Sequence, residues 1–354
     1  MKQQSDQRIG YFPDQSAKPT PAPRKPVPDI RRLLEGLRKH LSQRSDVRLL
    51  ALILCGLVFC SCLFLLVRYA FNIMISRSAS DHLESVYSAA VQETSAPSAT
   101  PLPTFTAKPS VTSFPRKNAL VPQKKQSQTA VELWPTSYVS NPTLRVSSIF
   151  YQLQAQNEDI VGWLKIDGVL EEAVVQRDNE YYLTHNALKQ KSVTGALFLD
   201  ENCDLDTVPT QMLIHGHNMK EGAMFGSLKK YKVKDASYYR EHPFIDFNTI
   251  YENGRYVIFS VAEVDIRNNK PDFLPFWHNA RFASADAFME YVNRSKLLSH
   301  YRCNVDVQPG DRLLTLSTCT GSDENKRLII MARKLRENEN ELELNMDIYS
   351  TSDR

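Results

Sequence analysis

The sequence predicts a mainly β domain, a barrel or a sandwich with inserted helices, preceded by one transmembrane helix. Three observations support this prediction. Nineteen uncharged residues, nearly all apolar, stand near the N-terminus, a Ser/Thr/Pro-rich stretch follows them, and the remainder contains many short strand-like runs separated by turn residues. Because 42% of the residues are hydrophobic and 23% are charged, the composition is that of a folded protein rather than a disordered one.

The charge of the chain is unevenly distributed. The net charge is +3, but residues 1–48 alone carry +6, so the rest of the chain carries −3. A nucleic-acid-binding protein usually has its excess positive charge on the folded domain. The acidic balance of the remainder therefore argues against a nucleic-acid partner, and the basic N-terminal stretch needs another explanation.

The apolar stretch from Leu49 to Val67 provides that explanation. As a helix it spans roughly 28 Å, close to the hydrocarbon thickness of a bilayer. Basic residues precede it and acidic ones soon follow, so the positive-inside rule places the N-terminus in the cytoplasm and the rest outside. We expect an uncleaved, single-pass signal anchor over 49–71. The small residues Ser78, Ala79 and Ser80 keep a cleavage site open as the alternative.

Composition also divides the rest of the chain. Residues 1–48 are basic and Pro-rich, which predicts a cytoplasmic tail without a core. Residues 72–133 are rich in Ser, Thr and Pro towards their end, which predicts a semi-extended extracellular stalk. We expect one folded domain over 134–344 and a C-terminal tail over 345–354.

Short apolar runs bounded by turn residues mark the strands of this domain. The predicted strands are 161–166, 173–176, 195–199, 212–215, 255–264, 312–319 and 328–332. Helices are predicted near 147–157, 224–231, 236–242 and 284–298. Many short strands with a few helices between them are typical of a decorated β-barrel or sandwich.

The six cysteines point to one reactive thiol. Three lie in the apolar span and three follow it, namely Cys203, Cys303 and Cys319. No Cys/His spacing typical of zinc occurs, so the sequence does not support a zinc site and we predict no metal. A disulfide between Cys203 and Cys303 stays open. Cys319 ends a strand-like run and opens a loop, and this accessible edge suits a nucleophile.

A thiol nucleophile needs a neighbouring base and a donor for the developing oxyanion. His217 follows the run 212–215, so we expect it at a strand end, as Cys319 is. Arg327 opens the next strand, and an antiparallel return would bring it beside Cys319. Each residue alone is more often structural, and only their combination at three strand ends predicts thiol chemistry. His215 and Arg333 share strand parity with His217 and Arg327 and remain alternatives.

Five segments, taken in chain order, resemble the class B sortases. They are NEDIVGWL at 157–164, DNEYYL at 178–183, GALFLD at 195–200, GHNM at 216–219 with MFGSL at 224–228, and TLSTC at 315–319. The resemblance covers about residues 145–335, most of the predicted domain. It implies an eight-stranded sortase-type β-barrel and a cysteine transpeptidase of the Gram-positive cell envelope.

The resemblance also implies roles for individual residues. Cys319 would attack the scissile carbonyl and form a thioacyl-enzyme. His217 would protonate the leaving amine and then deprotonate the incoming one. Arg327 would hydrogen-bond the substrate backbone or the oxyanion.

The resemblance further implies a groove for the sorting motif. Its predicted contacts are Asn179, Leu183, Ser317 and Thr318, and the segment 265–277 would cover the opposite side. The implied partners are secreted proteins with a C-terminal sorting signal, an amine of a peptidoglycan precursor or cross-bridge, and the membrane. No cofactor is implied.

Two other functions remain in competition with cell-wall anchoring. A pilin-polymerising sortase would use a lysine of another subunit as acceptor, but residues 72–140 contain no DPF/DPW-like lid motif. A catalytically silent extracellular binding module would not depend on Cys319.

Overall fold

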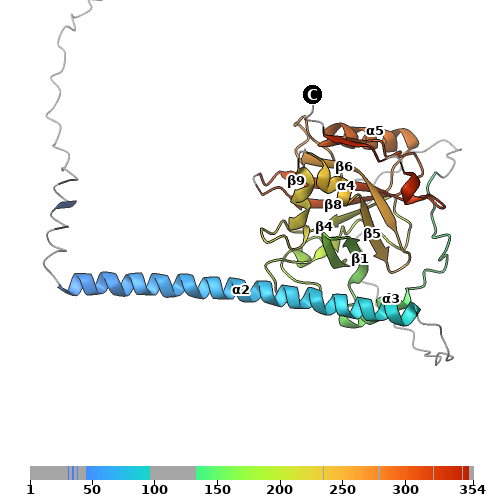
Figure 1. Ribbon diagram of the computed structural model, residues 1–354. Coiled ribbons are helices and arrows are strands. Elements are labelled where there is room, and N and C mark those ends of the chain that lie inside the picture. Colours follow the sequence, from blue (N-terminus) through green and yellow to red (C-terminus); the bar gives the residue numbers. More distant parts are fainter. Residues whose placement is uncertain are drawn as a thin grey trace, which may run out of the picture. The chain divides into compact units, whose positions relative to one another are not determined.

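The computed structural model describes Arg31, Leu34, Glu35, Arg38 and residues 45–95, 133–233, 235–277, 280–321, 323–344 and 346–350. The chain divides into one unit that ends at Leu66 and a second that begins at Val67. The second unit contains the β-sheet, shown in Figure 1.

Eight strands form a closed barrel, in the order β1-β2-β3-β4-β8-β9-β6-β5, and β5 pairs with β1. The barrel encloses the apolar core. Two neighbouring pairs, β2 with β3 and β4 with β8, are parallel, and the other pairs are antiparallel. The predicted eight-stranded barrel is therefore confirmed. The strands are β1 Ile160–Ile166, β2 Leu170–Val175, β3 Leu197–Leu199, β4 Gln211–His215, β5 Phe244–Thr249, β6 Arg255–Asp265, β8 Leu313–Cys319 and β9 Lys326–Lys334.

One barrel strand, β5, was not predicted. Its residues alternate, with Ile245, Phe247 and Thr249 buried on one face. The other face includes Asp246 and Asn248, which are residue types that strands usually avoid. Pairing with β1 on one side and β6 on the other therefore decides this strand against its local propensity.

The helices lie outside the barrel. The side chain of Ser284 caps α5 by accepting the amide of Ala287 at 3.1 Å, and Ser260 of β6 donates to the Ser295 carbonyl at 2.8 Å. Figure 1 shows α5 across β6 and α3 beside the end of α2. The helices are α3 Ser148–Gln156, α4 Ser237–Glu241 and α5 Ala285–Leu298, with 3-10 helices η1 Tyr181–Leu183, η2 Phe225–Lys232 and η3 Glu341–Glu343.

Two predicted boundaries differ from the structure. The helix expected at 224–231 is the 3-10 helix η2, and its Gly226 packs so closely on the preceding segment that a Cβ would lie 2.0 Å from the Met219 carbonyl. In the expected C-terminal tail, β10 (Ile348–Ser350) pairs with β7 (Tyr301–Cys303) as a separate two-stranded sheet. A strand of three residues has too little pattern to be predicted.

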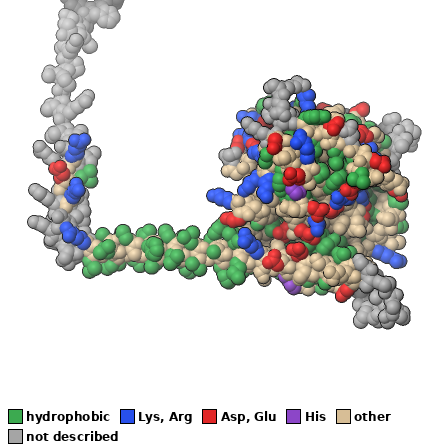
Figure 2. Space-filling model, in the orientation of Figure 1, with side chains coloured by type: hydrophobic (Ala, Val, Ile, Leu, Met, Phe, Trp, Pro, Cys, Tyr) green, Lys and Arg blue, Asp and Glu red, His purple; other side chains and the backbone are tan. Residues whose placement is uncertain are grey.

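The predicted membrane segment lies in α2 (Ser45–Ser95). Among the described residues, this is the one helix long and apolar enough to cross a membrane, and the most apolar part of it is not buried inside the protein. Figure 2 shows hydrophobic side chains along this exposed part of the helix.

The prediction of an extended stalk that begins at residue 72 is wrong for residues 72–95. The helix continues to Ser95, and its residues Ser76, Ala79, Leu83 and Ala90 are buried against the barrel. Tyr87 stacks on Trp163 of β1 with ring centroids 4.2 Å apart. The many serines of this stretch obscured a contact face that recurs every three or four residues. The remaining part of the predicted stalk, 96–132, lies outside the described residues.

We expect the substitution Glu172→Gln to raise stability above neutral pH and to change it little at acid pH. Burial raises the pKa of the Glu172 carboxyl from 4.5 to about 7, although the hydrogen bond from Ser80 lowers it. The folded state therefore holds this proton more tightly than the unfolded chain, so stability decreases as pH rises from about 4.5 to about 7. The variant should gain about 1–3 kcal/mol at pH 8, measured by urea unfolding.

The exposed carboxylate of Glu180 provides the matched control, and Glu180→Gln should leave the pH profile of stability as in the wild type. An equal effect of Glu172→Gln at pH 4 and pH 8 would contradict the explanation by burial.

Candidate active site

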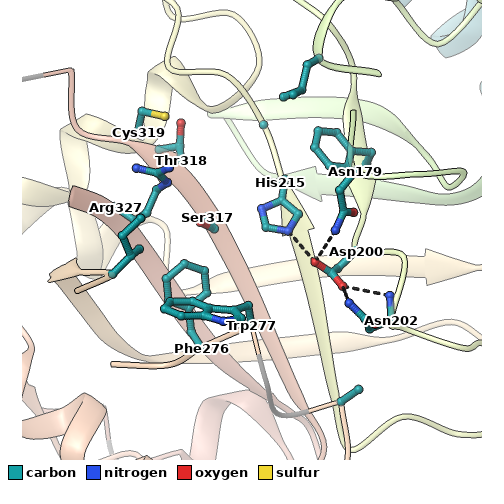
Figure 3. Close-up of a pocket in the computed structure, with 15 residues that line it drawn as sticks. Asn179, Asp200, Asn202, His215, Phe276, Trp277, Ser317, Thr318, Cys319 and Arg327 are labelled. Atoms are coloured by element: carbon teal, nitrogen blue, oxygen red, sulfur yellow. Dashed lines mark hydrogen bonds and ion pairs between the residues drawn. The ribbon is translucent and has the colours of Figure 1, made fainter. Parts of the chain in front are cut away.

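Cys319 and Arg327 lie opposite each other on neighbouring strands. Cys319 is the last residue of β8 and is exposed, and Arg327 stands near the start of β9. The antiparallel register pairs the two residues directly, as the short loop between them predicted. Figure 3 shows both side chains at one end of a pocket.

Only one nitrogen of the Arg327 guanidinium donates hydrogen bonds to the described residues. Its Nη1 donates to the carbonyls of Glu324 and Lys326, at 2.5 and 3.1 Å. The described residues provide no acceptor for its Nε and Nη2. A guanidinium with unused N–H groups beside a thiol can donate to an oxygen that becomes negative there.

His217 lies on the other side of β8. Strand β4 runs parallel to β8 and pairs His215 with Ser317, and the Gly216 amide donates to the Ser317 carbonyl at 3.2 Å. One residue beyond His217, the side chain of Asn218 donates to the Cys319 carbonyl at 2.8 Å. The backbone of His217 therefore passes beside the end of β8.

The imidazole of His217 has one identified partner. Its Nε2 lies 2.8 Å from the Leu183 carbonyl. Because a carbonyl only accepts, Nε2 carries the hydrogen and the neutral ring keeps Nδ1 as its basic nitrogen. The ring is thus oriented by the backbone just before the segment that leads to β3.

A groove of about 770 Å³ begins at Cys319 and Arg327. The predicted motif contacts Asn179, Leu183, Ser317 and Thr318 all line it, whereas His217 is not among its lining residues. The hydroxyl of Thr318 is buried without a partner among the described residues. The other lining residues are Phe198, Asp200, Asn202, His215, Gly216, Ile266, Phe276, Trp277 and Ala280.

One wall of the groove is apolar. Ile266, Phe276 and Trp277 come from the segment 265–277 after β6, which the sequence placed on this side. The rings of Phe276 and Trp277 meet edge to face at 5.1 Å. Figure 3 shows these two rings across the groove from His215.

The facing wall is polar and centres on Asp200. The Oδ2 of Asp200 lies 3.0 Å from His215 Nε2 and accepts from Asn179 Nδ2 at 3.1 Å. The Oδ1 accepts from the amide and the side chain of Asn202, both at 2.9 Å. Burial alone would raise the pKa of Asp200, but the hydrogen bonds from His215 and Asn202 outweigh it and the pKa is lowered.

Sequence reasoning missed this network. Asp200 ends the segment 195–200, which resembles the family, but the resemblance gave no role to its carboxylate. No motif or spacing in the sequence marks Asn202. Only the pairing of β3 with β4 brings Asp200 next to His215.

Comparison with known proteins identifies the family of the chain. A family model described as the sortase domain matches residues 164–335. Sortase B of Listeria monocytogenes is 36% identical over 186 residues, which cover 52% of this chain and 72% of that protein. The chain belongs to the class B sortases.

Two further proteins that are similar to the chain are also sortase B enzymes by name. Sortase B of Staphylococcus aureus is 27% identical over 191 residues, 53% of this chain and 75% of that protein. A crystal structure of sortase B from Bacillus anthracis in complex with AAEK2 is 28% identical, covers 61% of this chain and 89% of that one, and has a TM-score of 0.48. As a class B sortase, the protein is a cysteine transpeptidase.

The structure does not place Arg333, the alternative to Arg327, at the groove. Arg333 is buried and pairs in register with Leu313, at the opposite end of β8 from Cys319. Its guanidinium makes two hydrogen bonds of 2.6 Å to Glu339.

The other two cysteines of the sortase domain are not joined. Cys203 and Cys303 are both free thiols, so the disulfide left open by the sequence is not formed. Burial raises the pKa of Cys203 to about 12, which suits a structural thiol. Among the described residues, no group of three or more His, Cys, Asp or Glu side chains is arranged to hold a metal ion.

We expect Asp200→Ala to lower the free energy of unfolding by about 1–3 kcal/mol at pH 7, because the donors of His215, Asn179 and Asn202 lose their common acceptor. A carboxylate whose pKa is lowered by folding stabilises the protein above its ordinary pKa of 3.8, and this contribution is lost as pH falls further. The deficit of the variant, measured by urea unfolding, should therefore shrink below pH 4.

Glu201 is the exposed neighbour of Asp200 and offers the control. Glu201→Ala should change stability by less than about 0.5 kcal/mol. An Asp200→Ala protein as stable as the wild type at pH 7 would show that the network contributes nothing.

Proposed function

We propose that this sortase is anchored in the cell membrane and joins secreted proteins to an amine of the cell wall. It cleaves a sorting motif near the C-terminus of its substrate through a thioacyl-enzyme on Cys319. The observation that carries this proposal is the register of β8, which sets Arg327 directly opposite Cys319 and leads the chain of His217 past the same strand end.

The first half of the reaction forms the thioester. The thiolate of Cys319 attacks the scissile carbonyl, so a C–S bond forms and a negative charge develops on the oxygen, to which Arg327 donates. The C–N bond then breaks, and the imidazolium of His217 gives its Nδ1 proton to the leaving amine. The Nε2–H remains hydrogen-bonded to the Leu183 carbonyl throughout and keeps the ring oriented.

The second half transfers the acyl group. The acceptor amine attacks the thioester, Nδ1 of His217 takes its proton, and the C–S bond breaks to return the Cys319 thiolate. A free thiol has a pKa near 8.5, and a neighbouring imidazolium favours the thiolate. If the amine attacks faster than water does, the product is a new peptide bond.

The groove supports an extended peptide as substrate. Polar side chains of Asn179, His215 and Ser317 line one side, and the rings of Phe276 and Trp277 line the other. We assign Asn179, Leu183, Ser317 and Thr318 to contacts with the sorting motif. Recognition would then combine hydrogen bonds on one wall with apolar contact on the other.

The topology follows from charge and hydropathy. The exposed apolar part of α2 crosses the membrane once, with residues 1–48 in the cytoplasm and the barrel outside. In this organisation 49–71 is the anchor, α2 continues to Ser95 against the barrel, and the transpeptidase domain extends from 134 to β10. The secreted substrate and the cell-wall amine meet it on the outer side.

The thioester can be detected directly. The full chain in detergent micelles is incubated with quenched peptides of the NPxTx, LPxTx and SPxTG types and an amine acceptor, and the protein is then analysed by mass spectrometry. We expect an acyl adduct on Cys319 and a peptide joined to the amine, and neither with Cys319→Ala. Arg327→Ala should lower kcat/KM by about 10²–10³-fold because an oxyanion donor is lost.

Cleavage that is absent with every peptide, or that is equal in the wild type and Cys319→Ala, would refute the transpeptidase proposal. The second result would favour a silent binding module. A product that forms only with a lysine of another protein subunit would favour a pilin-polymerising sortase.

The base can be identified by a pair of substitutions. We expect His217→Ala to lower kcat by about 10²–10⁴-fold, because proton transfer to and from the amine is lost. His215→Ala should cost less than tenfold, since Asp200 holds its ring in the wall of the groove. The opposite order of the two effects on the rate of peptide cleavage would assign the base to His215.

A further inference from the structure

Gly195 lies against the imidazole of His217. A Cβ on Gly195 would lie 3.0 Å from Cδ2 of His217 and 3.1 Å from the Leu183 carbonyl that accepts from the ring. The φ angle of Gly195 is 59°, in the left-handed region that favours glycine. Any shift of this backbone would therefore press on the ring or release it.

Ser192 holds the loop that ends at Gly195. Its amide donates to the Thr184 carbonyl at 2.9 Å, and its hydroxyl lies 2.8 Å from the Thr194 hydroxyl and accepts the Thr194 amide at 3.0 Å. Ser192 and Thr194 are both buried. Ser192 thus joins the start of the loop, next to Leu183, to its end, next to Gly195.

Helix α2 reaches this loop through Ser76. The Ser76 side chain is buried and donates to the Asn72 carbonyl at 3.1 Å, and its hydroxyl also bonds the hydroxyl of Ser192. The hydroxyls can donate in the order Thr194 to Ser192, Ser192 to Ser76, and Ser76 to the carbonyl of Asn72, and the Thr194 hydroxyl also lies 3.4 Å from the Gly195 carbonyl.

Further contacts fix the same turns of α2. Ser80 donates to Glu172 of β2 at 2.8 Å, and Ala79 and Leu83 are buried. The helix is thus held against the barrel at the residues that surround Ser76.

We propose that Ser76 is a positioning residue for His217. Through Ser192 it holds the loop 184–195, and so it holds the Leu183 carbonyl on the Nε2–H of the imidazole. The inference rests on the proposed role of His217. A hydrogen bond from a charged donor is about twice as strong as one from a neutral donor, so this carbonyl stabilises the imidazolium and with it the thiolate of Cys319. Because α2 also contains the apolar span, the residue that positions the base belongs to the anchoring helix itself.

The test compares two serines that are two residues apart in the same helix, in the full chain in detergent micelles. Ser76→Ala removes the buried hydroxyl, and Ser78→Ala removes an exposed one. We expect Ser76→Ala to lower kcat about 5–10-fold with KM changed less than twofold, because neither Ser76 nor Ser192 lines the groove. Ser78→Ala should change neither by more than twofold, and thermal unfolding should confirm that both variants are folded.

A second measurement does not depend on knowing the substrate. The rate of alkylation of Cys319 by iodoacetamide at pH 7, followed by peptide mass mapping, reports the thiolate fraction. We expect about a threefold decrease in Ser76→Ala and none in Ser78→Ala. Ser192→Ala should match Ser76→Ala, and the double variant should be no slower than the slower single one, because the two hydroxyls act through each other.

Equal alkylation rates in Ser76→Ala and Ser78→Ala would overturn the proposal, and so would additive effects of Ser76→Ala and Ser192→Ala. If the wild type acts on no peptide, the transpeptidase proposal fails on its own, and the alkylation rates still decide the role of Ser76.

Discussion

Strand β8 pairs with β4 on one side and with β9 on the other, and the site depends on these two registers. The antiparallel register puts Arg327 opposite Cys319, and the parallel one leads the chain of His217 past the end of the same strand. Backbone hydrogen bonds along both ladders make each register costly to change, because a shift by one residue would turn every side chain to the other face. Cys319 and Arg327 therefore sit on paired strands of the barrel, and His217 follows the end of β4 by two residues.

The orientation of the imidazole depends on a less regular part of the fold. The backbone of η1 supplies the Leu183 carbonyl, and the loop 184–195 packs Gly195 against the ring. That loop is held by the side chain of Asn186 within it, by Asn157 on the Ala187 carbonyl, and by Ser192, which Ser76 of α2 contacts. In this protein one helix thus combines two chemically different segments, an exposed apolar one and a Ser/Ala-rich one that packs on the barrel.

The groove combines two walls with different origins. The aromatic wall comes from one continuous segment after β6, and the resemblance to the family implied its place. The polar wall joins residues from three parts of the chain around Asp200, and nothing in the sequence indicates that these parts meet. A buried carboxylate is costly when its acceptors are unsatisfied, so the four hydrogen bonds of Asp200 hold this wall together.

The sequence alone determined the features that depend on local pattern. The apolar span, most barrel strands, helix α5 and the accessible strand end at Cys319 follow from hydrophobic periodicity and turn residues. The resemblance to the family came from five segments in chain order. Tertiary structure alone decided three things: that β5 forms despite its Asp and Asn residues, that residues 72–95 pack as helix rather than extend as a stalk, and that Asp200 meets His215. The reason is the same in each case. These features arise from contacts between segments far apart in the chain, and neither propensity nor periodicity records which distant segments will meet.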